Sequence, residues 1–305
     1  MKNQKAFLNL LAFLTVAVWG TTFASTKILL NVLTPAEIMF FRFLIAYIML
    51  IIIYPKFHKI TSFKEECIFL IAGITGGSLY FITENTALIY TLTSNVGLIL
   101  ATAPIITALL AHFFTKGEQL NKNLFIGFIV AISGVFLVIF NGNFILKLNP
   151  IGDILALAAA LCWAIYSVSL KKISNKYNTI YITRKIFFYA LITISPFLFF
   201  SSTKLNISNL FTFKLMFNLL FLGVIASGVC YVTWSYTINK LGVIKTNNYI
   251  YLIPIITLIS SILILHEKVT TFSIIGAFLI LLGVYTSEHG IKFSFSLTNQ
   301  NSTKI

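Results

Sequence analysis

The chain has 305 residues, of which 58% are hydrophobic and only 10% charged, and its formal net charge is +14. Soluble domains carry about 25% charged residues, and a water-soluble fold of this size could not bury so much apolar surface. The composition therefore excludes a soluble enzyme, a disordered chain and a fibrous protein, and it indicates a helical protein that crosses the membrane several times.

Apolar segments of membrane-spanning length follow one another along the chain, and prolines, lysines, glutamates and glycines break them. A helix needs about 20 apolar residues to cross the hydrocarbon core. The predicted fold class is therefore an all-α polytopic membrane protein with ten transmembrane helices. We place the spans at residues 7–27, 36–54, 68–90, 94–114, 124–140, 152–171, 180–200, 215–238, 243–265 and 271–288.

Lysine and arginine residues gather in alternate connections between these spans. If the N-terminus is placed in the cytoplasm, most of the 22 basic residues fall on that side. Because positively charged loops stay in the cytoplasm, we predict that both termini are cytoplasmic and that the protein lies in the plasma (inner) membrane. The same argument assigns the basic charge to membrane topology, so no nucleic-acid partner is expected.

Motifs for bound cofactors and for catalysis are missing from the sequence. The three cysteines, Cys67, Cys162 and Cys230, lie far apart in or near apolar segments, so neither a disulfide framework nor a metal site is expected. The chain has no G-x-x-x-x-G-K-[ST] motif for nucleotide binding. We expect no enzyme, no cofactor and no metal. The expected partners are the lipid bilayer and a small-molecule substrate, with protons as a candidate coupling ion and a monomer or homodimer as the assembly.

The two halves of the chain repeat each other's motifs. Trp19 and Trp163 are each followed by a lysine at the same spacing, and the sequence Pro-Ile-Ile-Thr begins at both Pro104 and Pro254. Because each half has an odd number of spans, the second half enters the membrane in the opposite orientation. We predict two inverted-topology repeats of five spans, at residues 1–140 and 152–288, joined by an external connection at 141–151 and followed by a cytoplasmic tail at 289–305.

These motifs resemble those of the EamA-type ten-span transporters in the drug/metabolite transporter superfamily. The resemblance covers about residues 8–139 and 152–287. It rests on Trp19-Gly20-Thr21-Thr22-Phe23, Pro35, Arg42 and Gly117-Glu118 in the first half, and on Trp163-Ala164, Pro254 and Glu267 in the second. The resemblance implies transport of small organic solutes by alternating access, with the substrate in a central cavity between the halves.

One acidic side chain, Glu84, is expected deep within a span, and Arg42 of the preceding span is expected at a similar depth. An ionisable group inside the bilayer is costly and indicates a functional role. Two interpretations stay open. Either Glu84 carries protons or binds an ammonium group of the substrate, or it forms a buried ion pair with Arg42, whose role would then be structural.

Aromatic and neutral polar side chains of several spans complete the predicted site. Tyrosine and tryptophan combine an apolar face with a polar tip, which suits a cavity that holds an organic solute. The alternative is that each of them only packs within the bundle. The predicted substrate-binding residues are Trp19, Thr22, Tyr80, Glu84, Trp163, Tyr166, Tyr231, Trp234, Asn247 and Tyr251.

Prolines and small residues suggest where helices bend and where they pack closely. Proline interrupts helical hydrogen bonding, so Pro104 and Pro254 are predicted hinges, with static kinks as the alternative. Glycines let helices approach closely, and glutamates favour the positive end of a following helix. The predicted structural residues are Arg42, Glu118, Glu267, Gly127, Gly134, Gly276 and Gly283, the glycines lying at contacts between the halves or between protomers.

The predicted function is transport of small organic metabolites by alternating access. Amino-acid-like solutes are favoured because the candidate site is aromatic and neutral-polar with one acid. A nucleoside-type metabolite such as S-adenosylmethionine, or a cationic drug, is the alternative, since stacking and cation–π contacts would suit both. A non-transporting membrane receptor or assembly factor is the alternative from another class.

Overall fold

A computed structural model describes residues 2–59, 62–91, 93–140, 149–200, 212–265 and 270–289. Every regular element in these ranges is a helix, which confirms the predicted all-α class. The first half contains α1 (Lys2–Leu29), α2 (Pro35–Ile53), α3 (Phe63–Gly73), the π-helix η1 (Ile74–Ser78), α4 (Leu79–Tyr90), α5 (Thr93–Leu100), α6 (Ala103–Phe114) and α7 (Lys122–Phe140). The second half contains α8 (Pro150–Ile173), α9 (Thr179–Phe200), α11 (Phe213–Leu220), the π-helix η2 (Phe221–Val229), α12 (Cys230–Leu241), α13 (Val243–Asn247), the 3₁₀-helix η3 (Asn248–Leu252), α14 (Ile253–Leu265) and α15 (Thr271–His289).

The lengths and hydropathies of the helices agree with a membrane location. Within the described ranges, eight helical segments are long and apolar enough to cross a membrane, and Thr271–Ser287 of α15 adds a shorter apolar helix. Residues 243–265 pass through α13, η3 and α14 at the position of the ninth predicted span. The protein is therefore a polytopic membrane protein, while the count of ten spans stays a prediction.

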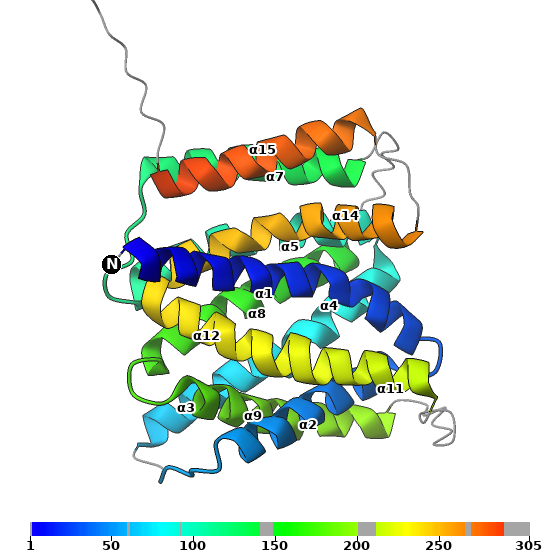
Figure 1. Cartoon of the computed structure of the whole chain (residues 1–305), viewed down its shortest axis with the longest axis vertical. Coiled ribbons are helices and arrows are strands. Elements are labelled where there is room, and N and C mark those ends of the chain that lie inside the picture. The colour runs from blue at the N-terminus through cyan, green and yellow to red at the C-terminus, as the bar shows by residue number, and fades with distance from the viewer. Residues whose placement is uncertain are drawn as a thin grey trace, which may run out of the picture.

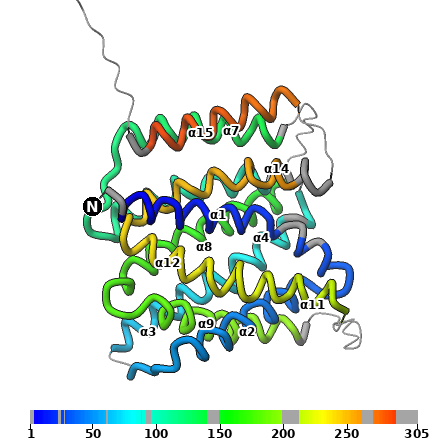
Figure 2. The backbone as a smooth tube through the Cα atoms, viewed as in Figure 1, coloured from blue at the N-terminus to red at the C-terminus, as the bar shows by residue number. Residues whose placement is uncertain are grey.

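The helices lie alongside one another in a bundle (Figure 1). The beginning of α1 and the end of α15 lie at the same end of this bundle (Figure 1). The pair formed by α7 and α15 takes one edge, while α2, α3 and α9 take the opposite edge (Figure 2). Helices α1, α8 and α12 lie between these edges and form the middle of the molecule.

The contacts between helices follow the inverted repeat. Helix α1 packs against α12 and α14, and its counterpart α8 packs against α4 and α6, the equivalent helices of the first half. Two further contacts join equivalent helices directly, α2 with α9 and α7 with α15. Exchanging the two halves therefore reproduces the contact pattern, as expected for a pseudo-two-fold axis in the membrane plane.

Glycines allow α7 and α15 to pack backbone against backbone. A Cβ atom on Gly134 would lie 2.5 Å from the carbonyl oxygen of Gly276, and one on Gly283 would lie 2.6 Å from the carbonyl oxygen of Gly127. No side chain larger than hydrogen fits at these distances. The four glycines singled out in the sequence thus meet one another within one chain, between its halves.

The third predicted span of each half contains a π-helix, η1 in the first and η2 in the second. Both segments contain glycines that admit a neighbouring side chain: Gly76 lies against the ring of Tyr166, and a Cβ on Gly223 would lie 2.6 Å from Ile45. A π-helical turn disturbs the regular ladder of backbone hydrogen bonds and is frequent at functional sites. The two halves therefore share this helical irregularity at equivalent positions.

Both candidate hinge prolines lie where a helix begins again after an irregular segment. Pro104 is in the first turn of α6, after the turn at residues 101–102, and Pro254 is in the first turn of α14, after η3. Proline suits a first helical turn because its missing N–H would have no intrahelical acceptor there. The prolines therefore follow a break in the helix and do not kink a continuous one.

Glu118 caps a helix of the opposite half. Its Oε1 accepts a hydrogen bond from the Val243 backbone N–H at 2.5 Å, and its Oε2 accepts one from that of Ile244 at 3.4 Å. Gly242 has a φ of 96°, which favours glycine, and it leaves room for this carboxylate. The expectation that Glu118 acts on the helix that follows it, α7, is wrong, since the carboxylate faces the positive end of α13. The equivalent Glu267 lies outside the described residues, as do residues 141–148 and the tail after residue 289.

Candidate functional site

A cluster of aromatic rings joins the two halves in the middle of the bundle. The ring of Trp19, from α1, lies 5.4 Å from that of Trp163 in α8, 5.6 Å from that of Tyr231 and 5.0 Å from that of Trp234, both in α12. These centroid distances are typical of favourable aromatic contacts. The repeat-related Trp19 and Trp163 are therefore direct neighbours, at the place where the halves meet.

Two tyrosines extend this cluster. The ring of Tyr80, from α4, lies 5.7 Å from that of Trp163. The ring of Tyr166 lies 5.3 Å from that of Trp163 and 5.9 Å from that of Tyr231. We call Trp19, Tyr80, Trp163, Tyr166, Tyr231 and Trp234 the aromatic cluster. Its members come from α1, α4, α8 and α12, so both halves contribute.

The polar tips of the cluster bind to the π-helices. The indole N–H of Trp19 donates to the carbonyl oxygen of Ala226 in η2 at 3.0 Å, and the hydroxyl of Tyr231 donates to that of Gly76 in η1 at 3.3 Å. A regular helix uses its carbonyls internally. The two π-helices thus offer acceptors to the cluster and position its rings.

Trp163 is held by a different partner. Its indole N–H donates to the side-chain oxygen of Asn247 at 2.9 Å, and the hydroxyl of Ser167 donates to the same oxygen at 3.3 Å. The amide nitrogen of Asn247 donates to the carbonyl oxygen of Val243 at 2.9 Å. Asn247 therefore ties the aromatic cluster to α13, the helix that Glu118 caps.

Burial separates the cluster members into two groups. Trp163, Tyr166, Tyr231 and Trp234 are buried, whereas Trp19 and Tyr80 are half-buried. The buried rings pack at the contact between the halves. The half-buried rings leave part of their surface uncovered by the bundle.

The two charged side chains predicted within the spans lie beside the cluster. The hydroxyl of Tyr80 donates to Glu84 Oε1 at 3.4 Å, and Arg42 Nε donates to Ser227 Oγ at 2.8 Å. The charges of Arg42 and Glu84 interact electrostatically. They form no ion pair with each other. The ion pairs found in the described chain are Glu65–Lys176 and Glu66–Lys185. The interpretation as a direct Arg42–Glu84 ion pair is therefore wrong.

The side chains of two predicted site residues, Thr22 and Tyr251, have other contacts. The hydroxyl of Thr22 donates back to the carbonyl oxygen of Trp19 at 2.7 Å and so bonds within its own helix. Tyr251 lines a separate crevice together with Pro104, Asn248 and Ser287, which has no room even for a water molecule. This crevice is too narrow to hold a metabolite. The structure thus places eight of the ten predicted binding residues in the cluster or in hydrogen-bond contact with its side chains, whereas the Thr22 hydroxyl bonds to its own helix and Tyr251 lines the separate crevice.

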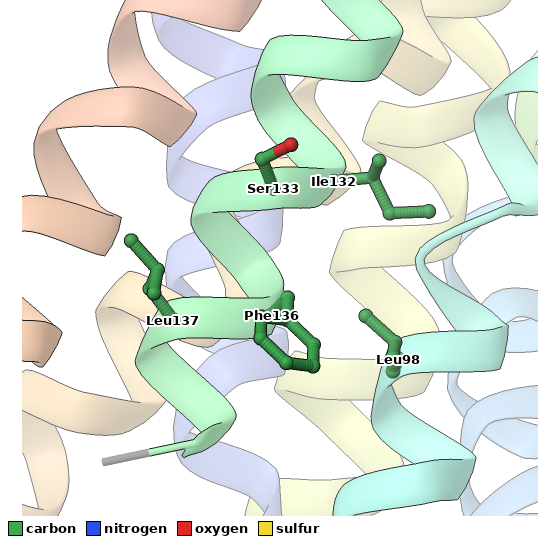
Figure 3. Close-up of a pocket in the computed structure, with 5 residues that line it drawn as sticks. All are labelled: Leu98, Ile132, Ser133, Phe136 and Leu137. Atoms are coloured by element: carbon green, nitrogen blue, oxygen red, sulfur yellow. The ribbon is translucent and has the colours of Figure 1, made fainter. Parts of the chain in front are cut away.

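A larger cavity lies on the outer face between α5 and α7. Its volume is about 440 Å³, and Figure 3 shows Leu98 of α5 beside residues of α7. Its lining consists of Leu98, Ile132, Ser133, Phe136 and Leu137. The one hydroxyl, of Ser133, donates to the carbonyl oxygen of Ile129 in its own helix at 2.8 Å. Such an apolar groove has the lining expected of a surface that faces acyl chains, and its one hydroxyl already donates within its own helix.

Sequence reasoning missed the residues that hold Arg42. Ser227 accepts its hydrogen bond, and the guanidinium lies 5.9 Å from the ring centroid of Phe43 and 5.4 Å from that of Phe81. Phenylalanines are abundant in the chain, and Ser227 belongs to a segment of small residues that reads as a helix contact. A signal for Ser227 existed only in the repeat, where it falls in the glycine-containing segment equivalent to η1.

Polar contacts tie the helices together at the end of the bundle that carries both chain ends. Glu65, at the start of α3, pairs with Lys176 after α8, and Glu66 Oε2 pairs with Lys185 Nζ in α9 at 2.5 Å. The hydrogen bond to Glu65 raises the pKa of Lys176. Lys171 Nζ also donates to the carbonyl oxygen of Asn239 at 3.1 Å. This end of the bundle is therefore fastened across both halves.

An all-helical bundle of two inverted halves, with aromatic and charged side chains gathered between them, is the architecture of a secondary membrane transporter. The chain belongs to the EamA-like transporter family, whose family model matches residues 6–140 and 150–287. Both matched regions coincide with the repeats described above. The protein is therefore a transporter and not an enzyme.

Relatives of similar length carry transporter names. The chain is 29% identical to an uncharacterized transporter of Archaeoglobus fulgidus, covering 91% of this chain and 96% of the relative. It is 26% identical to a protein of Escherichia coli (strain K12) named a probable amino-acid metabolite efflux pump, covering 93% of this chain and 96% of that protein. A crystal structure at 18% identity superposes with a TM-score of 0.73, covering 92% of this chain and 96% of that one, which shows the same fold.

Proposed function

We propose that this protein moves amino-acid-like metabolites across the plasma membrane by alternating access between its two halves. The observation that carries the proposal is the aromatic cluster, where Trp19 and Trp163 of the two halves lie 5.4 Å apart. Inverted-repeat transporters bind substrate at the interface of the repeats, near the middle of the bilayer. The half-buried Trp19 and Tyr80 would contact the apolar part of the solute.

The motion we propose follows from the contacts that hold the halves together. The polar contacts among Glu65, Lys176, Glu66 and Lys185 would open when the site faces the side that carries the chain ends. The breaks before Pro104 and Pro254 are the proposed hinges, because an interrupted helix bends more easily than a continuous one. In this mechanism the protein alternates between a state that is open to one side of the membrane and a state that is open to the other. Bound substrate changes the relative populations of these two states, and no covalent chemistry occurs.

Several further features belong to this proposal. Positively charged connections favour cytoplasmic termini, and the two described chain ends do lie at one end of the bundle (Figure 1). The name of the Escherichia coli relative, a probable amino-acid metabolite efflux pump, supports the solute class proposed here. Protons are the candidate coupling ion, and Glu84 is the candidate side chain either for carrying them or for contacting an ammonium group of the solute.

A second solute class is favoured by the same rings. Tryptophan and tyrosine faces attract cations, and the cluster places three indoles within 6.1 Å of one another. A nucleoside-type metabolite with a cationic centre, such as S-adenosylmethionine, or a cationic drug would fit this surface. If the protein transports these solutes and no amino acid, the second solute class is correct and the amino-acid proposal is wrong.

Purified protein in proteoliposomes tests the proposal. We expect uptake of at least one radiolabelled amino acid from a panel, above the level of protein-free liposomes, with saturation at increasing concentration. Purine derivatives and quaternary amines form the comparison set. Saturable uptake restricted to that set would favour the second solute class, and a protein that transports neither set would contradict both.

A further inference from the structure

Arg42 is a buried guanidinium with most of its hydrogen-bonding capacity unused. Its side chain is only 6% exposed, and arginine carries five N–H donors. Within the part of the chain that the structure describes, one of them is used, by Nε to Ser227 Oγ at 2.8 Å. A buried cation that lacks a bonded anion is costly. The outer edge of the guanidinium, formed by Nη1 and Nη2, is therefore the part that an added anion could satisfy.

Glu84 is an acidic side chain that, like Arg42, makes little use of its hydrogen-bonding capacity. Its one hydrogen bond within the described chain comes from the Tyr80 hydroxyl at 3.4 Å, a long and weak contact. Its charge interacts with that of Arg42, yet the two side chains do not pair. Two opposite charges thus lie beside the aromatic cluster, and each makes a single hydrogen bond within the described chain.

The repeat provides an internal comparison for Arg42. Its counterpart Arg184 is also buried, but its Nη1 and Nη2 donate to the carbonyl oxygens of Tyr54 and Lys56. Its guanidinium further lies 4.5 Å from the ring centroid of Phe57. Both Nη atoms of Arg184 therefore bind backbone carbonyls that fix the side chain in the fold, whereas Arg42 makes its hydrogen bond through Nε.

Glu84 has no acidic counterpart in the second half. Tyr80 of α4 corresponds to Tyr231 of α12, and Gly77 corresponds to Gly228. At the same offset, the residue equivalent to Glu84 is Ser235. The Ser235 hydroxyl is buried and has no hydrogen-bond partner in the described chain. The two charged side chains that make only one hydrogen bond each, Arg42 and Glu84, thus both belong to the first half, and the second half does not repeat them.

We propose that Arg42 and Glu84 are the two poles of one dipolar binding site, in which a zwitterionic solute places its carboxylate on the Arg42 guanidinium edge and its ammonium group against Glu84 and Tyr80. This inference rests on the proposed function and assigns residues to it. A planar guanidinium edge binds a carboxylate through two parallel hydrogen bonds. The apolar part of the solute lies on Trp19 and Tyr80, the half-buried rings of the cluster.

A dipolar site selects against solutes that carry only one of the two charges. An amine would leave the Arg42 guanidinium unpaired, and a carboxylic acid would leave Glu84 unpaired. Leaving a buried charge without its partner costs more than a lost neutral contact. The site should therefore prefer a solute with both groups, which a cluster of aromatic rings alone would not do.

Competition on the unmodified protein in proteoliposomes is the first test. The probe is radiolabelled leucine or phenylalanine, whichever gives the larger uptake. The competitors are the unlabelled amino acid, its decarboxylated amine and its deaminated acid. We expect the amine and the acid to compete at least tenfold more weakly than the amino acid. Equal competition by the amine would overturn the role of Arg42, and equal competition by the acid would overturn that of Glu84.

Single substitutions are the second test. Arg42→Gln should lower the uptake ratio of amino acid to amine at least tenfold, and Glu84→Gln should lower the ratio of amino acid to acid similarly. Arg184→Lys is the matched control, in which both ratios should stay unchanged even if the yield of protein falls. Ratios that stay unchanged in Arg42→Gln would overturn the proposal, because a structural residue affects all solutes alike.

A conservative variant keeps the test decisive if Arg42→Gln does not insert into the membrane. Arg42→Lys retains the charge but loses the planar edge. We expect a KM for the amino acid at least fivefold higher with little change in kcat, and an unchanged KM would overturn the proposal. Absence of amino-acid uptake by the unmodified protein would instead overturn the proposed function, so the two failures are distinguishable.

Discussion

The indoles of the aromatic cluster differ in how completely the bundle surrounds them. Trp234 is fully buried at 0% exposure, whereas Trp19 is half-buried. A buried side chain contributes chiefly to stability, because its removal leaves a cavity. Under the proposed function, a half-buried ring in the aromatic cluster would contribute to substrate binding as well, through the part of its surface that the bundle leaves uncovered.

Substituting these two indoles separately tests that difference. Trp234→Ala should lower stability by about 3–5 kcal/mol, the usual cost of removing a large core side chain. Trp19→Ala should cost less stability and raise the KM of the transported solute, because the stacking surface is lost. Thermal unfolding in detergent and uptake in proteoliposomes measure the two effects. Equal losses of stability with an unchanged KM in Trp19→Ala would show that Trp19 is packing only.

Part of the site could be predicted at this scale. The shared motif identified Trp19 and Trp163 as equivalent, and their rings do lie 5.4 Å apart. The Arg42–Ser227 hydrogen bond could not be predicted, because it joins residues in different halves and depends on how α2 packs against η2. Thr22 shows the converse. It follows the motif tryptophan closely in sequence, yet its hydroxyl bonds to its own helix.

Among the helices, the α7–α15 pair depends most directly on small residues. A Cβ atom on Gly134 would lie 2.5 Å from the Gly276 carbonyl oxygen and 2.6 Å from the Ile280 nitrogen. We expect Gly134→Ala to destabilise the protein by about 1–3 kcal/mol, as overpacking does. Ser133→Ala, on the neighbouring groove face, is the control and should cost little. Thermal unfolding measures the stability of both variants. Equal melting temperatures for Gly134→Ala and Ser133→Ala would contradict the close contact between α7 and α15.

Glu118 links two helices of different halves through one carboxylate. Replacing a helix cap costs about 0.5–2 kcal/mol, so Glu118→Ala should lower the thermal stability by about that amount. Glu118→Gln keeps an acceptor oxygen for the Val243 N–H and should lose less. Unfolding curves of the two variants provide the measurement. A variant without Glu118 that is as stable as the parent would contradict the cap.

The elements themselves were well predicted in position and less well in detail. Each predicted span has a helical segment at its place, because long apolar runs between polar breaks determine where helices can lie in a bilayer. The π-helices η1 and η2 were not predicted, since their composition also suits a regular helix. The cap of α13 by Glu118 was assigned to the wrong helix, because local sequence shows only the helix that follows.

For the whole molecule, the inverted repeat and the membrane topology make one connected prediction. Reporter fusions after residues 60, 118, 175 and 241 should report a cytoplasmic location, and fusions after residues 146 and 207 an external one. The reason is that basic connections stay inside and that each half has an odd number of spans. An external signal after residue 175 would contradict both the orientation and the predicted count of spans.

The central claim is that the two halves carry an amino-acid-like solute by alternating access to a site between them. Counterflow in proteoliposomes tests it most directly. Vesicles are loaded with an excess of unlabelled amino acid and diluted into a trace of the same amino acid in labelled form. We expect the label to accumulate transiently above its external concentration, because the excess of unlabelled amino acid inside competes with the label for export while labelled molecules continue to enter. Label that only equilibrates, or that never enters, would contradict the account.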